Sequence, residues 1–387
     1  MITYRTIAEK LGLSPSTVAN ILNGTPNYKK ETVERALNAV EELGYQPNRA
    51  SRAIRRRRSN LIGIIHVGLP YEIGNRIVRS VIREVSAAGY DYLVGDALWN
   101  IENPTQLLKE MVQSRVEGVI LCGNSSLLYD GNRIDIFRRA GIPMVSLFGD
   151  SRWDVPIVRE DIASGIFALC QHLQGLGHRK ILMMVARRLG EGVSLGTDGR
   201  SRGFREAVKP WGTLLELDED EFLRTWPRVY HKYDGKNIGV ILRFAWDNQG
   251  HDIVRSAYQL SRRLLSCDGA IPDAIMATND RAAYGVFNAA QELKLRVPDD
   301  LAITGVDDDE FSSFPMFRLT TLRINVEGPC RAAVSMLLSR LRSAAPRKKL
   351  KVTEQFFPTQ MVLRRSCGRL VKFGDPEEIV LPVEPRF

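Results

Sequence analysis

The sequence of 387 residues has few cysteines and no long apolar run. Its five cysteines, an odd number, are scattered and never spaced C-x-x-C, which argues against a disulfide framework and a zinc site. No stretch approaches the ~18 apolar residues of a membrane span. Met1–Lys10 alternates polar and apolar residues, where a secretory signal has a basic lead and an apolar run. We therefore expect a cytoplasmic protein with reduced thiols and no membrane partner.

Motifs of common enzyme classes are missing as well. No G-x-G-x-x-G follows the first apolar run of the body, and the chain has no P-loop and no H-E-x-x-H. The acidic run Asp307–Glu310 is better explained as a solvated loop than as a metal site. We therefore expect no catalytic residue, no cofactor and no metal ion.

Positive charge is concentrated at the start of the chain. Residues 1–60 hold eleven Lys or Arg against five Asp or Glu, so this segment carries +6 of the formal net charge of +9. Six of the ten residues in Arg49–Arg58 are Arg. Basic charge confined to one small segment is typical of binding to a polyanion such as DNA.

Capping signals predict three short helices before residue 45. Thr6 and Glu9 form a capping box for the first, and Ser14 caps a second that has Pro15 in its first position. A third is expected over Glu31–Leu43, and together they are the plan of a helix-turn-helix domain. The helices are predicted to end at Gly12, Gly24 and Gly44 and to bury Ile7, Ala8, Leu11, Val18, Ile21, Leu22, Val33, Ala36, Leu37 and Val40.

The second helix is the candidate reader of the DNA major groove. Asn bonds an adenine edge in bidentate fashion and Ser serves several bases, so we assign base reading to Ser16 and Asn20. The alternative is that these are ordinary exposed side chains of a small helical domain. The residues not assigned to the core are Pro15, Ser16, Thr17, Ala19, Asn20 and Asn23, and those suited to phosphate are Thr6, Thr17, Asn23 and Tyr45.

Residues 48–59 are predicted to form a hinge. Asn48 can cap a helix over Arg49–Arg55, which is far shorter than the ~12–15 residues that an isolated helix needs in water. We expect this segment to fold only on DNA. Ile54, apolar among arginines, is suited to wedging into a minor-groove step, whereas the alternative for the arginines is a solvated linker or a nonspecific phosphate grip.

From Leu61 onward, short apolar runs alternate with amphipathic helical stretches. This alternation predicts parallel sheets with crossover helices, and two sheets suit the length better than one. Ligands of such sheets bind beyond the carboxyl ends of the strands, so we expect a binding place between two lobes. The expected strands are 61–67, 91–94, 118–121, 143–147, 180–185, 237–242, 273–277 and 301–305, and the expected helices are 76–88, 106–114, 162–176, 253–265 and 282–293.

The helix-turn-helix and hinge segments closely resemble those of the lactose-repressor (LacI/GalR) family of bacterial transcriptional regulators. The resemblance implies a homodimer on near-palindromic double-stranded operator DNA, a recognition helix at Ser14–Asn23 and a hinge helix at Asn48–Arg55. Ile54 stands where Leu is usual in the family, and Arg52 and Arg55 flank it. The matching headpiece runs are Thr6–Ser14, Ser16–Gly24, Glu31–Arg35, Glu42–Asn48 and Arg52–Arg55.

The resemblance extends to about Gly368 and implies a two-lobed, periplasmic-binding-protein-like α/β domain with parallel sheets. One lobe would hold residues 60–160 and 295–322, and the other 161–294 and 323–368. The tail, 369–387, lacks the leucine heptads by which some relatives form tetramers, so a dimer is expected. The domains are thus a headpiece (1–47), a hinge (48–59), an effector-binding and dimerisation domain (60–368) and the tail. The matching runs include Arg115–Ile120, Gly141–Pro143, Leu176–Arg179, Thr278–Asp280, Arg296–Asp300, Gly305–Asp308 and Leu319–Thr321.

The family match places three effector-binding residues at Arg200, Asn279 and Asp307. Their chemistry suits a hydroxylated ligand, because Arg donates, Asp accepts and Asn does both. Each has a structural alternative: a solvated helix end, a helix cap and an acidic loop. Trp246, Phe244 and Tyr71 are weaker candidates for an aromatic plate, and core packing is their alternative. Tyr71–Arg76 replaces the family's Asn-Pro-Phe-Phe-like run, and Trp211–Lys236 is longer and more irregular than expected.

The leading hypothesis is a sequence-specific transcriptional regulator, a repressor, controlled by a small-molecule effector that is a sugar or sugar derivative. The competing hypothesis is a cytoplasmic sugar-binding or sugar-processing α/β protein without specific DNA recognition, because parallel α/β sheets host many such reactions. Neither the effector nor the direction of its effect on DNA binding is written in the sequence.

Overall fold

The structure is a computed structural model that divides into two compact units, Met1–Asn60 and Leu61–Phe387. Each unit is described by itself. The residues that the structure describes are 3–22, 28–44, 58–66, 72–97, 104–123, 133–149, 155–188, 196–246, 253–267, 269–342, 353–368 and 378–387. The predicted hinge helix over residues 48–55 lies outside them.

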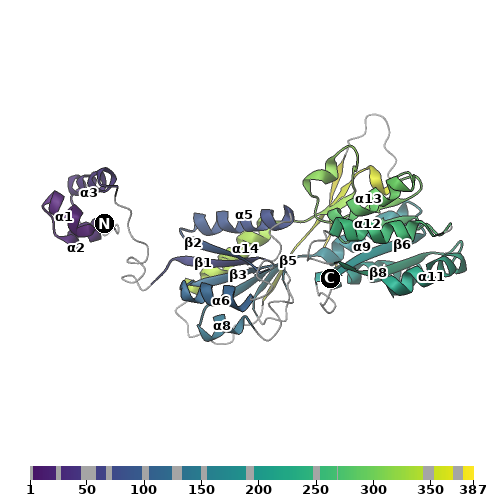
Figure 1. Ribbon diagram of the computed structural model, residues 1–387, viewed down its shortest axis with the longest axis horizontal. Coiled ribbons are helices and arrows are strands. Elements are labelled where there is room, and N and C mark those ends of the chain that lie inside the picture. Colours follow the sequence, from purple (N-terminus) through teal and green to yellow (C-terminus); the bar gives the residue numbers. More distant parts are fainter. Residues whose placement is uncertain are drawn as a thin grey trace. The chain divides into compact units, whose positions relative to one another are not determined.

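The first unit contains the three predicted helices: α1 (Tyr4–Leu11), α2 (Pro15–Leu22) and α3 (Lys30–Glu42) (Figure 1). The core between the helices contains Ile7 of α1, Val18 of α2 and Ala36 of α3, all fully buried. Ser14 caps α2 as predicted, since its Oγ accepts from Thr17 N at 3.0 Å. The helix-turn-helix plan is confirmed.

Three details of this unit differ from the sequence prediction. Helix α1 begins three residues earlier than predicted, because its N-cap is Thr3 and not Thr6. Thr3 and Thr6 form the capping box, and Thr6 is the third helical residue. Leu37 is 51% exposed, since Ala36 and Ala39 face the core and a helical residue turns about 100° from its neighbour. Ala19, grouped with the readers, is buried at the edge of the apolar face of α2.

The second unit is built on two parallel sheets and a small antiparallel one. The first sheet has the order β12-β5-β4-β3-β1-β2, and the second has the order β10-β9-β6-β8-β7. The eight predicted strands all exist, and six more were not predicted. The strands are β1 (Leu61–His66), β2 (Asp91–Asp96), β3 (Gly118–Cys122), β4 (Met144–Leu147), β5 (Ile157–Glu160), β6 (Lys180–Arg188), β7 (Thr213–Asp218), β8 (Ile238–Trp246), β9 (Ala274–Met276), β10 (Ala302–Thr304), β11 (Thr321–Arg323), β12 (Glu354–Phe357), β13 (Gln360–Leu363) and β14 (Ile379–Pro382).

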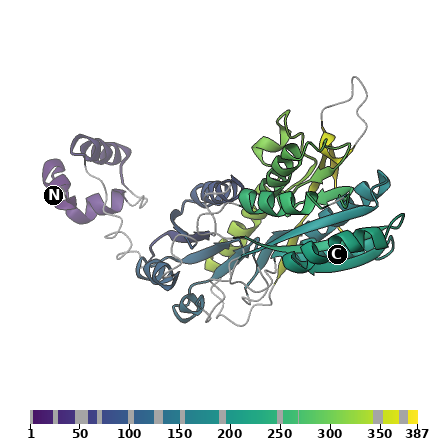
Figure 2. The ribbon, with the colours of Figure 1, turned by 45° about the vertical axis from the view of Figure 1, so that its right-hand side comes forward.

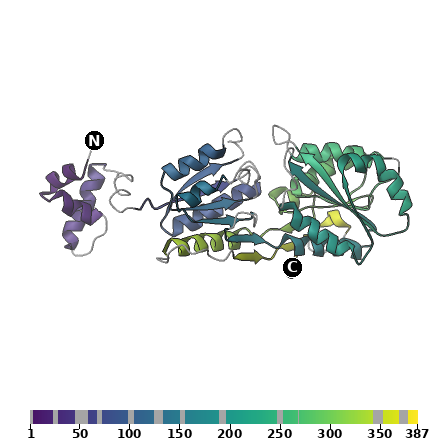
Figure 3. The same cartoon turned by 90° about the horizontal axis from the view of Figure 1, so that it is seen from below.

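Helices cover both faces of each parallel sheet (Figure 2). Helix α14 packs against α5, β3 and β4 of the first sheet, alongside which it lies in Figure 3. Among the helices that cover the second sheet, α12 packs on α13 and α9 packs on α10. The helices of this unit are α5 (Glu72–Ala87), α6 (Pro104–Gln113), α8 (Asp135–Arg139), α9 (Ile162–Gly175), α10 (Gly196–Val208), α11 (Glu219–Lys232), α12 (Ile253–Leu265), α13 (Asp280–Glu292) and α14 (Glu327–Arg342), with short 3-10 turns η3 (Glu310–Ser313) and η4 (Arg365–Cys367).

The predicted division of the lobes is wrong in its second half. Residues 295–322 were assigned to the first lobe, but β10 pairs with β9 in the second sheet. Residues 323–368 were assigned to the second lobe, but α14 and β12 pack on the first sheet, where β12 pairs with β5. Strand pairing between distant segments decides this point, and it leaves no mark on local periodicity.

The stretch Trp211–Lys236 is regular, contrary to the sequence prediction. It forms the edge strand β7 and helix α11, whose Phe222 and Trp226 are buried and stacked with ring centroids 4.8 Å apart. The Trp226 indole donates to Ala270 O at 2.6 Å. The many charged residues of α11 and Pro227 inside it make the sequence look unlike a buried helix. The packing of the two aromatic rings outweighs this low local helix propensity.

Glu216 of β7 forms pH-dependent ion pairs with two arginines of this lobe. It accepts from Arg205 of α10 at 2.5 Å and also pairs with Arg243 of β8. The hydrogen bond from Arg205 and the contact with Arg243 lower the pKa of Glu216 from 4.5 to about 2. A depressed carboxylate pKa stabilises the fold above the unfolded-state pKa, and this stabilisation is lost as pH falls from about 4.5 towards 2.

We expect Glu216→Gln to lower the free energy of unfolding at neutral pH by about 1–2 kcal/mol, because the pair is partly exposed and screened. Urea unfolding over a pH series measures this loss, and the difference from wild type should shrink in acid. Glu310→Gln, at an exposed site, is the control. An equal difference at neutral and acid pH would contradict the assignment.

The last residues of the chain pack onto the second unit. Strand β14 pairs with β13, and Val383 is buried. Phe387 packs edge-on against Phe167 of α9, and Arg386 N donates to Ser164 Oγ at 2.8 Å. Residues 378–387 of the predicted tail are therefore part of the folded domain.

Candidate functional sites

Helix α2 presents a short polar face. Ser16 and Asn20 are exposed, as the base-reading prediction requires. Asn20 Nδ2 donates to Tyr28 OH at 3.1 Å, and Ser14 Oγ lies 2.8 Å from both Ser16 Oγ and Thr17 Oγ1. These contacts hold the side chains in place before any DNA is bound. The predicted contacts Asn23, Tyr45, Asn48, Arg52, Ile54 and Arg55 lie outside the described residues.

In the second unit, hydrogen bonds bring Arg200, Asn279 and Asp307 to one place. Arg200 of α10 donates through Nε to Thr278 O at 2.9 Å. Asn279 follows Thr278 and caps α13, because its Oδ1 accepts from Ala282 N at 2.9 Å. Asp280, which follows Asn279, donates its N–H to the carbonyl oxygen of Val306 at 2.8 Å, and Val306 directly precedes Asp307. Three segments far apart in the sequence therefore converge.

Glycines bring α9 and α10 into close contact beside this place. A Cβ atom on Gly203 would lie 2.2 Å from Ala163 O, and one on Gly199 would lie 2.6 Å from Ile162 Cγ2. Arg200 is thereby held next to the first turn of α9. That turn follows directly on Glu160, the last residue of β5, so a carboxylate of the first lobe joins the cluster.

The charges of this cluster act on one another. Burial raises the pKa of Asp307 to about 7; the nearby Arg200 opposes the shift, and Glu160 adds to it. Burial also raises the pKa of Glu160, against the effect of Arg200. Arg76 of α5 contributes a second positive charge near Asp307. We call these four residues, Arg76, Glu160, Arg200 and Asp307, the charged cluster.

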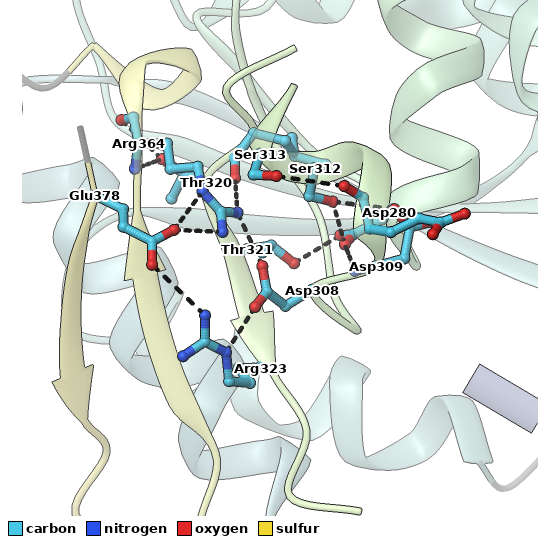
Figure 4. Close-up of polar contacts among 12 residues, drawn as sticks. Asp280, Asp308, Asp309, Ser312, Ser313, Thr320, Thr321, Arg323, Arg364 and Glu378 are labelled. Atoms are coloured by element: carbon cyan, nitrogen blue, oxygen red, sulfur yellow. Dashed lines mark hydrogen bonds and ion pairs between the residues drawn. The ribbon is translucent and has the colours of Figure 1, made fainter. Parts of the chain in front are cut away.

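The backbone at Asp307 is strained, with φ at +112°, and the next residue also has a positive φ of 52°. An ion-pair network holds this turn (Figure 4). Asp308 binds Arg323 at 2.6 Å and Arg364 at 2.9 Å, and Arg364 also binds Glu378 at 2.7 Å. Strain of this kind persists only where the surroundings over-determine it.

Asp280 fixes the other side of the turn. Its carboxylate, fully buried, accepts from Ser312 Oγ and Thr321 Oγ1, both at 2.6 Å, and from Asp309 N at 2.9 Å (Figure 4). Burial and the charge of Asp307 raise the pKa of Asp280, while these three donors oppose the shift. Asp307 is thus anchored between two polar networks.

Two parts of the chain match described protein families. Residues 3–48 match bacterial regulatory proteins of the lacI family, and residues 170–367 match the periplasmic binding protein-like domain. The chain belongs to the lacI family of bacterial regulatory proteins. The resemblance inferred from the sequence is confirmed.

The relatives of this lacI-family chain are similar over nearly their whole length. It is 27% identical over 375 residues to the HTH-type transcriptional repressor PurR of Erwinia tasmaniensis, covering 95% of this chain and 97% of that protein. It is 27% identical over 366 residues to the ribose operon repressor of Halalkalibacterium halodurans, with coverages of 95% and 97%. Both relatives are transcriptional regulators.

Solved structures of the family share the fold. The lac repressor dimer bound to operator and the anti-inducer ONPF has a TM-score of 0.74 at 22% identity, covering 95% of this chain and 99% of that one. A LacI family regulator from Enterococcus faecium with bound ribose has a TM-score of 0.59 at 20% identity, covering 80% and 100%. The headpiece and the two-lobed α/β architecture are confirmed.

The aromatic candidates of this lacI-family chain are less informative. Phe244 is a buried core residue, so the structural alternative holds for it. Trp246 ends strand β8, but its side chain is not described, and Tyr71 lies outside the described residues. Sequence reasoning missed Glu160 and Tyr28. The signal for Glu160 was its place after a strand, but that strand was not recognised.

Other classes of site are not apparent in the described part of the chain. Within it, no group of three or more His, Cys, Asp or Glu could hold a metal ion, and no helix has the length and apolar character to cross a membrane. All five cysteines are free thiols, four of them buried.

Proposed function

We propose that this lacI-family chain is a sequence-specific DNA-binding repressor controlled by a small hydroxylated effector, a sugar or sugar derivative. One observation carries the proposal: a helix-turn-helix unit with exposed Ser16 and Asn20 is joined to a domain that gathers Arg200, Asn279 and Asp307 at one polar site. The named relatives repress transcription, and solved neighbours carry ribose, cellobiose or ONPG. We place the protein in the cytoplasm and assign it no catalytic role.

The DNA contacts proposed divide into two groups. Ser16 and Asn20 read base edges, while the other headpiece residues contact phosphate or support the helix end. The hinge residues would order on DNA and insert Ile54 into the minor groove. The full proposed set is Thr6, Ser14, Ser16, Thr17, Asn20, Asn23, Tyr45, Asn48, Arg52, Ile54 and Arg55.

Control by the effector follows from linkage between two states. The charged cluster has members from both lobes, since Arg76 and Glu160 come from the first and Arg200 and Asp307 from the second. A ligand that contacts both lobes favours one lobe arrangement, and it changes operator affinity by no more than its differential affinity for the two states. Arg200, Asn279 and Asp307 are the proposed contacts, with Trp246 and Tyr71 as aromatic candidates.

A homodimer is proposed for operator binding. The second lobe exposes an apolar surface beside η3 and the turn after it, and contiguous exposed apolar patches mark interaction sites. A hollow of about 340 Å³ lined by Phe287, Met316 and Phe317 adjoins it. The exposed side chains are Phe311 (42%), Phe314 (45%) and Met316 (68%).

The function is tested on the full-length protein in two steps. Selection from random double-stranded DNA should recover a near-palindromic site, and a thermal-shift screen of sugars, sugar acids, amino sugars and nucleosides should find a ligand that changes binding to it. Arg200→Ala should weaken that ligand at least about tenfold because a charge-assisted hydrogen bond is lost. Arg202→Ala, on the same helix but stacked on Phe387, is the control. Recovery of no preferred DNA site would refute the proposal.

A further inference from the structure

Glu160 has one carboxylate oxygen that is not satisfied within the described part of the protein. This atom, Oε2, is buried and has no hydrogen-bond partner among the described residues. The cation beside it in the sequence, Arg159, binds Glu354 through Nη2 at 2.8 Å and stacks on Phe356, while its Nε is itself buried without a hydrogen-bond partner among the described residues. A buried unpaired carboxylate oxygen is costly, so the free protein carries a cost here that a bound group could remove.

Glu160 lies beside the proposed effector site. The residue lies at the carboxyl end of β5, and Asp161 directly after it caps α9 through Ser164 N at 3.1 Å. The first turn of α9 packs on Gly199, next to Arg200. The charge of Arg200 lowers the pKa of Glu160, and the charge of Glu160 raises the pKa of Asp307.

The cations of the charged cluster offset only part of the effect of burial on its two acids. Arg200 donates its Nε to Thr278 O and acts on both acids through its charge, and Arg76 acts on Asp307. Burial still dominates at both Glu160 and Asp307 and raises both pKa values. Within the described part of the chain no group donates a hydrogen bond to Glu160 Oε2, and a positively charged donor compensates a buried carboxylate better than a neutral hydroxyl does.

We propose that Glu160 is a specificity-determining residue that receives a protonated amine of the effector, so that the ligand class is an amino sugar or amino polyol. The inference rests on the proposed function and narrows its ligand. Arg200, Asn279 and Asp307 bind the hydroxyl groups, while Glu160 selects the amine. Sugar acids and sugar phosphates are disfavoured, because their negative charge would face Glu160 and Asp307.

The pH dependence of binding follows from the same groups. An amine binds the ionised carboxylates, so its affinity should rise as pH increases through the Asp307 pKa of about 7, and burial also raises the pKa of Glu160. An anionic ligand would show the opposite trend. The charged groups that face these two acids are Arg159 and Asp161 on the adjoining segment, Arg200 on α10, Arg76 on α5, and Asp280 and Asp309 near the Asp307 turn.

Matched pairs of ligands test the inference on the full-length protein. Calorimetry compares glucose with glucosamine and with 6-amino-6-deoxyglucose, galactose with galactosamine, and adds gluconate and glucose 6-phosphate. The wild type should bind an amine at least about tenfold more tightly than its neutral partner. Glu160→Gln, nearly isosteric, should reduce the preference to about threefold or less, whereas Glu160→Asp keeps the charge and should retain part of it.

The outcomes separate this inference from the proposed function. A tighter fit of neutral or acidic sugars, an amine preference unchanged in Glu160→Gln, or no amine binding by a wild type that still binds its selected operator would overturn the inference alone. Failure of the wild type to select any DNA site would instead remove the proposed function. Glu206→Gln, at a half-buried position of α10 where Glu206 pairs with Lys209, is the matched control and should leave all ligand affinities unchanged.

Discussion

An Arg364→Ala protein is expected to lose about 3–5 kcal/mol of unfolding free energy, as is typical when one partner of a buried ion pair is removed. The Arg364 side chain is 5% exposed and that of Asp308 is 8% exposed. Arg364 also donates to Leu319 O at 2.9 Å and binds Glu378 of the last segment. Removing the guanidinium leaves Asp308 buried with Arg323 alone, next to the strained turn at Asp307.

Urea unfolding followed by circular dichroism measures this loss in the domain that contains residue 364. Arg365→Ala is the matched control, because Arg365 is the exposed neighbour, and surface changes of this kind stay within about 0.5 kcal/mol. Glu378→Gln should cost less than Arg364→Ala, since Glu378 is 41% exposed. A loss below about 1 kcal/mol for Arg364→Ala would show that the network does not support the turn.

Asn20→Ala is expected to weaken the selected operator by about 1–3 kcal/mol per headpiece, the range of a bidentate base contact. A dimer carries two copies, so the total loss is about 2–6 kcal/mol when the two contacts are independent. Tyr28 holds the Asn20 amide in the free headpiece, so Tyr28→Phe should give a smaller loss in the same direction. Affinity for random DNA should not change, because the phosphate contacts remain.

Gel-shift titration of the selected site and of random DNA at several salt concentrations measures this effect. The slope of affinity against salt should be the same in wild type and Asn20→Ala, since no phosphate contact is removed. Asn38→Ala, at an exposed position of α3, serves as the control. Equal weakening on specific and random DNA would assign Asn20 to phosphate rather than to a base.

Local signals were sufficient wherever an element is defined by its own residues. The cap at Ser14, the buried runs such as Leu61–His66 and the amphipathic helix Ile253–Leu265 carry their pattern in consecutive positions, and all three formed where predicted. The exposed placement of Ser16 and Asn20 followed by subtraction of the core. Ala19 and Leu37 were misplaced because both lie near an edge of their helix's apolar face, where periodicity is least decisive.

Contacts between distant segments were not accessible in this way. Strand β12 joins the first sheet and β10 the second through hydrogen bonds to strands far away in the sequence, so the lobe boundaries were mispredicted. Helix α11 depends on Phe222 and Trp226 packing into the second lobe, and its charged surface hides that core. Residues 378–387 gain their place from β13 and α9, neither of which is near them in the chain.

For this protein, the sequence by itself determined the family, the helix-turn-helix unit and the parallel α/β class, and it supplied the three polar residues that we propose for the effector site. These depend on residue identity and short-range spacing, which act within a turn or a strand. Only the tertiary structure decided which segments share a lobe, that Arg364 and Glu378 support the turn at Asp307, and that the charge of Arg200 acts on Glu160. Those features depend on burial and on charges brought together across the fold, where desolvation changes what a carboxylate can bind.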